Sequence, residues 1–474
     1  MSRTSQHPSS FRDPAGFIFK QGDVVYRQIN HEGREDFDFF LESGLYGALT
    51  KKGLVVPHKE VKNTSRFDND DRRYKIIQPE QIPFISYPYE WSFAQLKDAA
   101  LLTMRIQRLA FKHGMILKDA SAYNIQFIGK KPVLIDTLSF KKYVPGEPWE
   151  GYRQFCEHFL APLAVAHYTS YDILKILQSD IEGIPLGVAC SLLPKRARFG
   201  KGLLTHLFLH SASQKRYENI ASDKTVKDVP KRKVSQFALE GLMASLERAV
   251  HTLRPPRQKT EWGNYYDFTN YSNEAFKKKQ KLVRDMLKKV SPVPKVVWDM
   301  GANNGEFSVL AAQMGAYTLA FDIDPVAVGR NYHHRDQKTD DLMLPLVQDC
   351  TNPSASVGWM GHERDSLFER GPADVVMALA IIHHLAIGRN LPLPRVAEFL
   401  AAVGNHVIIE FVPKEDSKVQ ILLASRRDIF AEYSAEHFEA AMEQYFKLVE
   451  KKPIQHSKRT LYLYKKKRIV PGNG

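Results

Sequence analysis

Residues 296–324 read VVWDMGANNGEFSVLAAQMGAYTLAFDID, and this stretch decides the fold of the C-terminal half of the chain. The apolar run Val296–Trp298 predicts a strand that ends at Asp299. Gly301 and Gly305 then mark a loop, because glycine lets a backbone turn tightly and approach a ligand closely. A helical pattern and a second apolar strand follow, so the stretch predicts a βαβ unit.

The second strand, residues 317–321, ends at Asp322, which lies 21 residues after Gly301. An acid at this distance from a glycine loop can accept both hydroxyls of a ribose. Asp324 and Pro325 predict the start of the next helix, with Asp324 as the N-cap and Pro325 in the first turn. The stretch is therefore typical of an α/β unit that binds a nucleoside.

The spacing of the glycines distinguishes two classes of cofactor. A dinucleotide site has G-x-G-x-x-G, whereas this chain has D-x-G-x-x-x-G, and the leading acid repels a pyrophosphate but suits a ligand with an ammonium group. The pattern resembles motif I of class I S-adenosylmethionine (SAM) methyltransferases, with Asn303 where that family often has glycine. The alternatives are an NAD-type unit and a plain core strand. The resemblance implies that SAM is bound by Asp299, Gly301, Asn303, Gly305 and Asp322.

The pattern continues over about 170 residues with alternating strands and helices. Strands are predicted at 344–349, 406–412, 447–454 and 459–466, residues 373–385 are predicted as a strand and the loop after it, and helices are predicted at 325–333, 395–403 and 433–445. Such alternation predicts a mostly parallel seven-stranded sheet with both faces covered, in which ligands bind beyond the carboxyl ends of the strands. Asp349 ends the third strand, where the methyltransferase family reads the adenine amino group.

The loop after the fourth strand contains His383 and His384, which can accept a proton from a hydroxyl nucleophile. The alternative is that they form the wall of the site. Glu410, at the end of the fifth strand, is a weaker candidate base. Enzymes that methylate amides and exocyclic amines commonly have Asn/Asp-Pro-Pro-aromatic in this loop, so methylation of DNA bases is disfavoured.

An aromatic cluster precedes the first of these strands, in residues 260–290. The corresponding segment of methyltransferases often closes over SAM, and aromatic faces attract a sulfonium and stack on adenine. Tyr266 and Tyr271 are therefore candidate cofactor contacts. The alternative is a helix packed on the sheet with its aromatic residues in the core, and Lys277–Lys281 is expected to be solvated.

The N-terminal half has a second signal. Residues 93–112 predict a long helix, and after it come Asp119, Asn124 and an apolar strand that ends at Asp136. This resembles the catalytic loop and metal-binding acid of protein kinases and aminoglycoside phosphotransferases. The resemblance implies that Asp119 orients an acceptor hydroxyl and that Asn124 and Asp136 hold Mg²⁺ against ATP.

The N-terminal half also departs from that family. Leu117 replaces the histidine two residues before the acid, and no G-x-G-x-x-G loop lies upstream. The strand that would carry the ATP-contacting lysine offers Arg27, with Glu42 as its predicted partner and Lys75 as another candidate cation. A kinase-like fold without phosphoryl transfer is the alternative.

Composition fits a soluble, cytoplasmic enzyme. The chain has 474 residues, three widely spaced cysteines and no run of apolar residues long enough to span a membrane. The net charge of +14 is dispersed, so nucleic-acid binding is a possibility that the sequence does not favour. We expect a disordered tail (1–15), a kinase-like α+β domain (16–220), a linker and helix (221–257) and a Rossmann-like class I methyltransferase domain (258–467).

The whole arrangement resembles bacterial SAM-dependent methyltransferases of the nodulation protein NoeA type. The resemblance implies methyl transfer and gives less information about the acceptor. The leading hypothesis is O-methylation of a small molecule or glycan. The alternatives are a bifunctional kinase-methyltransferase acting on a glycan, and an RNA-modifying methyltransferase with a pseudokinase-like domain.

Overall fold

The computed structural model describes residues 6–64, 67–223, 233–257, 260, 273–334, 336–424 and 426–468. The chain forms two compact units. Unit 1 contains residues 1–128, 132–258 and 356–364, and unit 2 contains residues 129–131, 259–355 and 365–474. In the described part of the chain, no helix combines the length and the apolar run that crossing a bilayer requires.

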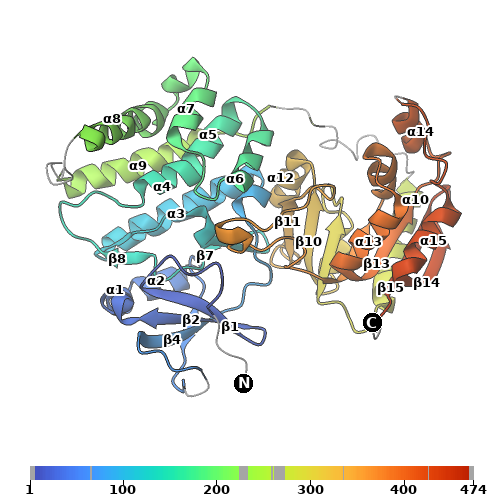
Figure 1. Ribbon diagram of the computed structural model, residues 1–474, viewed down its shortest axis with the longest axis horizontal. Helices are drawn as coiled ribbons and strands as arrows, with labels where there is room; N and C mark the ends of the chain where they lie inside the picture. The colour runs from blue at the N-terminus through green and yellow to red at the C-terminus, as the bar shows by residue number, and fades with distance from the viewer. Residues whose placement is uncertain are drawn as a thin grey trace. The chain divides into compact units, whose positions relative to one another are not determined.

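Unit 1 combines a four-stranded sheet with a group of helices (Figure 1). The sheet has the order β1-β2-β4-β3 and is antiparallel throughout. Its strands are β1 (Gly16–Gln21), β2 (Val24–Asn30), β3 (His58–Glu60) and β4 (Arg73–Pro79), and helices α1 (Arg34–Glu42) and α2 (Leu45–Lys51) lie between β2 and β3 in the chain.

The longest helix of unit 1 is α3 (Phe93–Lys112), which matches the predicted range. Its start is fixed by a capping box in which Ser92 and Gln95 bind each other's backbone amides. Short strand pairs and helices follow: β5 (Met115–Leu117), β6 (Ile125–Ile128), β7 (Lys131–Leu134), β8 (Phe140–Lys142), α4 (Tyr152–Phe155), α5 (Ala161–Tyr168), α6 (Ile176–Ser179), α7 (Leu186–Leu192), α8 (His210–Asp223) and α9 (Gln236–Thr252).

Two parts of the predicted division of unit 1 need correction. The tail predicted as disordered is hydrogen-bonded from residue 6 onward, because the His7 amide donates to the Ile18 carbonyl (2.7 Å) along β1. The helix predicted between the domains is α9, which packs against α3 and belongs to unit 1. Most of the predicted charged linker, residues 224–232, lies outside the described residues.

Unit 2 is built on a seven-stranded mixed sheet with the order β11-β10-β9-β12-β13-β15-β14. The first five strands in this order are parallel, and β15 and β14 are antiparallel. The strands are β9 (Val296–Met300), β10 (Tyr317–Asp322), β11 (Met343–Val347), β12 (Ala373–Ala378), β13 (Gly404–Phe411), β14 (Phe446–Pro453) and β15 (Thr460–Lys466). The register of β14 on β15 shifts at a bulge between Leu448 and Glu450.

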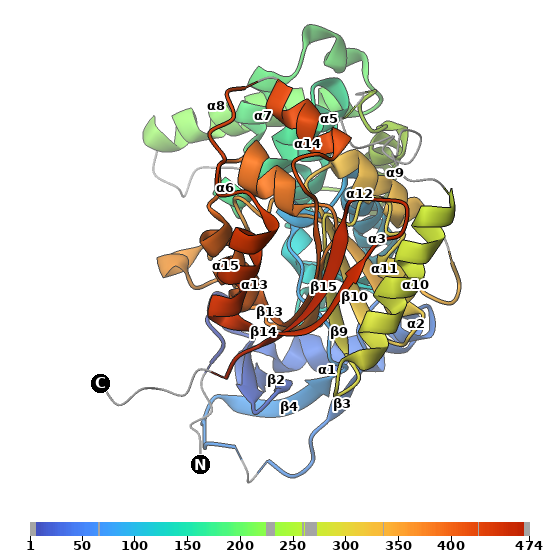
Figure 2. The same ribbon diagram turned by 90° about the vertical axis from the view of Figure 1, so that its right-hand side faces the viewer.

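Helices cover both faces of this sheet (Figure 2). Helices α10 (Asn273–Lys289) and α11 (Ser308–Ala312) lie on one face, and α13 (Leu393–Val403) and α15 (Ala435–Tyr445) lie on the other. Helices α12 (Pro325–His333) and α14 (Ser417–Ala424) complete the unit. The central strands are buried on both sides, which explains their nearly continuous apolar sequences.

Candidate cofactor site and its surroundings

The glycine loop follows β9 and has the backbone geometry that its sequence requires. Gly301, Asn303 and Gly305 have φ angles of +80°, +49° and +86°, in the left-handed region that favours glycine and tolerates Asn. The amides of Gly301 and Ala302 both donate to the carbonyl of Phe321 (2.9 Å each). These bonds hold the loop against the end of β10.

Asp322, the last residue of β10, holds the same loop in place by hydrogen bonds from backbone amides. Its Oδ2 accepts the amide of Asn303 (2.8 Å) and its Oδ1 accepts the amide of Asp324 (2.8 Å). Burial raises the pKa of this carboxyl to about 6, against the lowering effect of these amides. Each carboxylate oxygen retains a second lone pair with which it can accept a ligand hydroxyl.

Asp299 lies in β9 and is 2% exposed. Its Oδ2 accepts the hydroxyl of Ser308 at the start of α11 (2.6 Å). Burial raises the pKa of Asp299 to about 7, although Ser308 and the nearby Lys279 ammonium lower it. The carboxyl group therefore lies beneath the loop and is only partly ionised at neutral pH.

Gly305 and Gly301 each lie close to a side chain from another segment of unit 2. A Cβ on Gly305 would come within 2.5 Å of Asn331 Nδ2, and one on Gly301 would lie 3.2 Å from Ile381 Cδ1. The side-chain amide of Asn331 has no hydrogen-bond partner among the described residues. Gly305 therefore permits the approach of the buried Asn331, whereas Gly301 lies against the loop after β12.

Asp349 follows β11 and lies at the same edge of the sheet, because β11, β10 and β9 are parallel neighbours. Its Oδ1 accepts the amide (2.8 Å) and the hydroxyl (2.7 Å) of Thr351. The structure thus brings together six predicted cofactor residues at the carboxyl ends of three adjacent strands: Asp299, Gly301, Asn303, Gly305, Asp322 and Asp349.

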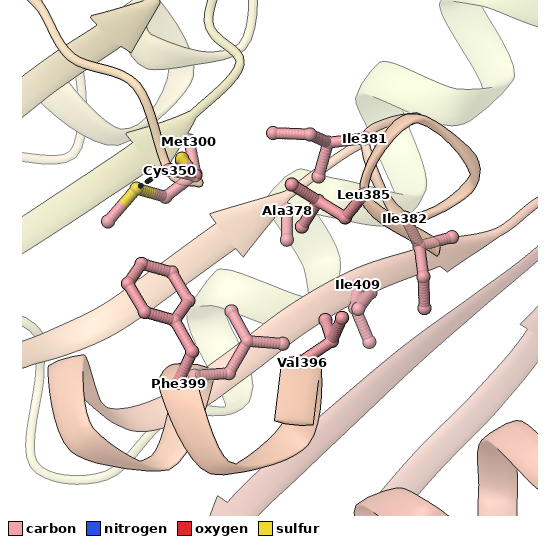
Figure 3. Close-up of a pocket in the computed structure, with 10 residues that line it drawn as sticks. Met300, Cys350, Ala378, Ile381, Ile382, Leu385, Val396, Phe399 and Ile409 are labelled. Carbon is pink, nitrogen blue, oxygen red and sulfur yellow. Dashed lines mark hydrogen bonds between the residues drawn. The ribbon is translucent and has the colours of Figure 1, made fainter. Parts of the chain in front are cut away.

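An apolar pocket lies beside this edge (Figure 3). Met300 and Cys350 line it from the ends of β9 and β11, with their sulfur atoms 3.5 Å apart. The loop after β12 and helix α13 contribute the other walls, including Ile381, Leu385 and Phe399. The lining has no charged side chain, so this part of the site is a low-dielectric surface.

The predicted tyrosine contacts, Tyr266 and Tyr271, lie outside the described residues.

His383 and His384 follow β12, and their ring centroids are 4.1 Å apart. His383 is 2% exposed, and its Nδ1 has no hydrogen-bond partner among the described residues. Burial lowers the pKa of both imidazoles, to about 4 for His384 and well below the usual value for His383, and the Arg459 charge adds to the effect in both. Both rings are therefore neutral at pH 7 and can accept a hydrogen bond, but they are weak bases.

A buried charge network, defined here as Lys279, Glu410, Arg459 and Asp416, lies next to His383. Lys279 Nζ is 2.5 Å from Glu410 Oε2, and Arg459 donates to Glu410 (3.3 Å) and, with two nitrogens, to Asp416 (2.7 and 3.1 Å). Glu410 is thus engaged by two cations, which leaves it poorly suited to the role of a base.

The expectation that Lys277–Lys281 is solvated is wrong for Lys279, which is 3% exposed. Burial lowers the pKa of Lys279, against the raising effect of Glu410. The sequence contained a signal for this placement, because Lys279 shares the apolar stripe of α10 with Ala275, Val283 and Met286.

In unit 1 the structure brings Asp119, Asn124 and Asp136 together. Burial and the charge of Asp136 raise the pKa of Asp119. Asn124 donates to the hydroxyl of Ser139 (3.1 Å), and this hydroxyl donates to Asp136 (2.8 Å). The described residues contain no group of three or more His, Cys, Asp or Glu arranged to hold a metal ion.

Arg27 forms an ion pair with Asp136, and not with Glu42 as the sequence predicted. Burial raises the pKa of Asp136, but Arg27 and Ser139 outweigh it and hold the pKa below its usual value. Lys75, the other candidate cation, pairs with Asp38 (3.4 Å) and Glu60 (3.7 Å). The guanidinium of Arg27 therefore provides the positive charge beside Asp136.

Two solved structures show weak likenesses to the chain. The bifunctional kinase-methyltransferase WbdD aligns over 43% of this chain and 41% of its own, with 19% identity and a TM-score of 0.30. Magnesium protoporphyrin IX methyltransferase from Synechocystis PCC 6803, solved with bound SAH, aligns over 44% of this chain and 93% of its own, with 17% identity and a TM-score of 0.29. The chain thus spans less than half the length of WbdD, and neither likeness carries an argument about function.

Sequence comparison is more informative. No protein-family profile matches the chain. Nodulation protein NoeA of Rhizobium meliloti (strain 1021) is 34% identical over 466 residues, which cover 98% of this chain and 97% of NoeA. With this identity over nearly the whole of both chains, the protein belongs to the family of nodulation protein NoeA.

Proposed function

We propose that unit 2 is a SAM-dependent methyltransferase. The observation that carries the proposal is the gathering of six predicted cofactor residues around the glycine loop, at the carboxyl ends of β9, β10 and β11. Ligands of parallel α/β sheets bind at this edge. When bound, SAM supplies a methyl group that an acceptor atom can displace in line.

Each residue of the site has a role in this proposal. Asp322 accepts hydrogen bonds from the ribose hydroxyls, and Asp349 accepts one from the adenine amino group. Asp299 supplies negative charge for the ammonium group, and the loop backbone from Gly301 to Gly305 lies along the ligand. The lining of the pocket beside them is apolar, and low-dielectric surroundings strengthen polar contacts of this kind. Tyr266 and Tyr271 remain predictions from the sequence.

We further infer that the acceptor atom is a hydroxyl oxygen of a small molecule or a glycan. The neutral imidazoles of His383 and His384 can accept a hydrogen bond from such a hydroxyl and orient its oxygen. Their lowered pKa values favour this orienting role over full deprotonation. The Nδ1 of the buried His383 has no hydrogen-bond partner in the described part of the chain, which makes His383 the stronger candidate of the two.

Phosphoryl transfer by unit 1 is not part of the proposal. A Mg²⁺ ion between Asn124 and Asp136 would need their oxygen atoms as ligands. Both oxygens of Asp136 are already engaged, by Arg27 and by Ser139, whereas Asn124 donates to Ser139 through its nitrogen. A cation held at Asp136 would also lie next to the Arg27 guanidinium, so the described residues do not fit the metal.

The cofactor site can be tested by substitution of Asp322. Asp322→Ala should weaken SAM binding by about tenfold to a hundredfold, because a lost charge-assisted hydrogen-bond partner costs about 1.5–3 kcal/mol. Gly301→Val should also weaken binding, because φ is +80° and a side chain would press on Ile381. Titration calorimetry on the full chain measures both, with the exposed Glu432→Ala as the control. Wild-type affinity in a folded Asp322→Ala protein would refute the site.

SAM affinity should also depend on pH. The free protein has pKa values of about 6 for Asp322 and about 7 for Asp299, both raised by burial. The ligand favours the ionised carboxylates, so binding releases protons, and affinity should rise from pH 5 to pH 7 by up to about tenfold per unit for each group. Calorimetry in buffers of different ionisation enthalpy measures the released protons. Asp322→Asn should remove the contribution of Asp322, and proton uptake on binding would contradict the proposal.

The acceptor class can be tested with methyl-labelled SAM and a lysate separated into glycans, lipids, RNA and protein. We expect label in the glycan or small-molecule fraction with the wild type and with Glu432→Ala, and none with Asp322→Ala. Label that depends on Asp322 but appears in RNA would support the methyltransferase proposal and overturn the proposed acceptor class.

The pairing of Arg27 with Asp136 predicts that Mg²⁺ with ATP leaves the melting temperature of the wild type unchanged, since a ligand stabilises only a protein that binds it. Thermal unfolding with Mg²⁺ alone is the control. A rise in the melting temperature with Mg²⁺-ATP that is absent in Asp136→Ala would instead support the bifunctional alternative.

A further inference from the structure

Residues 183–217 of unit 1 contain no Asp or Glu, although acids make up 53 of the 474 residues of the chain. The same 35 residues contain six basic side chains: Lys195, Arg196, Arg198, Lys201, Lys215 and Arg216. All six are exposed. Within these 35 residues no acidic side chain balances the positive charge, and the nearest acids in the sequence are the flanking Glu182 and Glu218.

The stretch also exposes large apolar side chains. Phe199 is 89% exposed, Leu209 57%, Val188 45%, Leu204 42% and Leu192 40%. Val188 and Leu192 are four residues apart on α7 and share one face of that helix. Leu204 and Leu209 are five apart in the π-helical turn η7 (Leu204–Leu209), whose hydrogen bonds have that spacing, so they also share a face.

Contacts between these elements show that they are neighbours in unit 1. A Cβ on Gly187 of α7 would lie 3.7 Å from Lys215 Cε of α8. The thiol of Cys190 on α7 lies within electrostatic range of both Lys215 and Arg198. Helix α7 and η7 are in contact, as are η7 and the turn that carries Phe199. We call the exposed basic and apolar side chains of residues 183–217 the basic-apolar patch.

We propose that the basic-apolar patch binds the surface of an anionic lipid bilayer. Exposed Phe, Leu and Val side chains can enter the boundary between headgroups and acyl chains, while the Lys and Arg side chains around them reach lipid phosphates. Single exposed apolar residues are common on protein surfaces, but five within one strongly basic stretch are not.

Two other occupants fit the patch less well. A nucleic acid would pair with the basic side chains, but four of the five apolar side chains are aliphatic and have no ring on which a base could stack. A second copy of the chain that placed its own patch on this one would bring two basic stretches together at the cost of like-charge repulsion. The inference concerns unit 1 and does not rest on the proposed methyltransferase activity.

The test is co-sedimentation of the full chain with vesicles of phosphatidylcholine alone or mixed with phosphatidylglycerol. We expect binding to the anionic vesicles and not to the neutral ones, with weaker binding at high salt. Replacing Arg196 and Arg198 together by Ala should reduce binding by about 25-fold, because each basic residue near an anionic surface contributes about fivefold. Phe199→Ser with Leu209→Ser should also reduce it.

Matched controls lie elsewhere in unit 1. Val144 is 50% exposed outside the patch, so Val144→Ser should bind vesicles like the wild type, as should Lys51→Ala with Lys52→Ala. All sites are exposed, and circular dichroism checks that each variant is folded. Equal binding by patch and control variants, binding to neutral vesicles, patch-dependent binding of RNA without vesicle binding, or a dimer disrupted by the patch substitutions would each overturn the proposal.

Discussion

The hydrogen bonds of the Asp322 carboxylate are the interaction on which the proposed cofactor site of unit 2 depends. Its two oxygen atoms accept amides from opposite sides, Asn303 of the glycine loop and Asp324 at the start of α12. One side chain therefore sets the position of the loop and of the next helix. The loop needs left-handed backbone conformations at Gly301, Asn303 and Gly305, and these residue types adopt them with little steric cost.

The buried charge network plays a similar part at the carboxyl end of β13, at the same edge of the sheet. Its members come from α10, the end of β13, the segment before α14 and the residue before β15. Two cations and two carboxylates balance each other, which offsets the large cost of removing each charge from water. Because Lys279 also lowers the pKa of Asp299 and Arg459 that of His383, the network links helix packing to the electrostatics of the site.

The sequence predicted the sheet well, because its buried strands are apolar runs. The strand predicted at 406–412 is β13, Gly404–Phe411, and the final antiparallel pair is found as expected. Left-handed geometry at Asn303 was also readable. These features depend on residues that are close in the chain.

Partners from distant parts of the chain were harder to predict. Arg27 and Asp136 are 109 residues apart, and the pattern of neither segment identifies the other as its ion-pair partner. Lys279 lies in a lysine-rich run, and only its place on the apolar stripe of α10 distinguishes it from the neighbouring solvated lysines. The burial of His383 likewise depends on packing over β12 and could not be read from the loop itself.

Strand β14 has a consequence for how the protein behaves at high concentration. It is the last strand of the seven-stranded sheet, so one row of its backbone groups faces away from the other strands. An exposed edge of this kind can add a strand from another molecule and so start aggregation. Here the edge carries Lys447, Lys451 and Lys452, is bent by the bulge after Leu448 and ends at Pro453. Charge, curvature and a residue without an amide proton thus oppose the addition of a further strand at this edge.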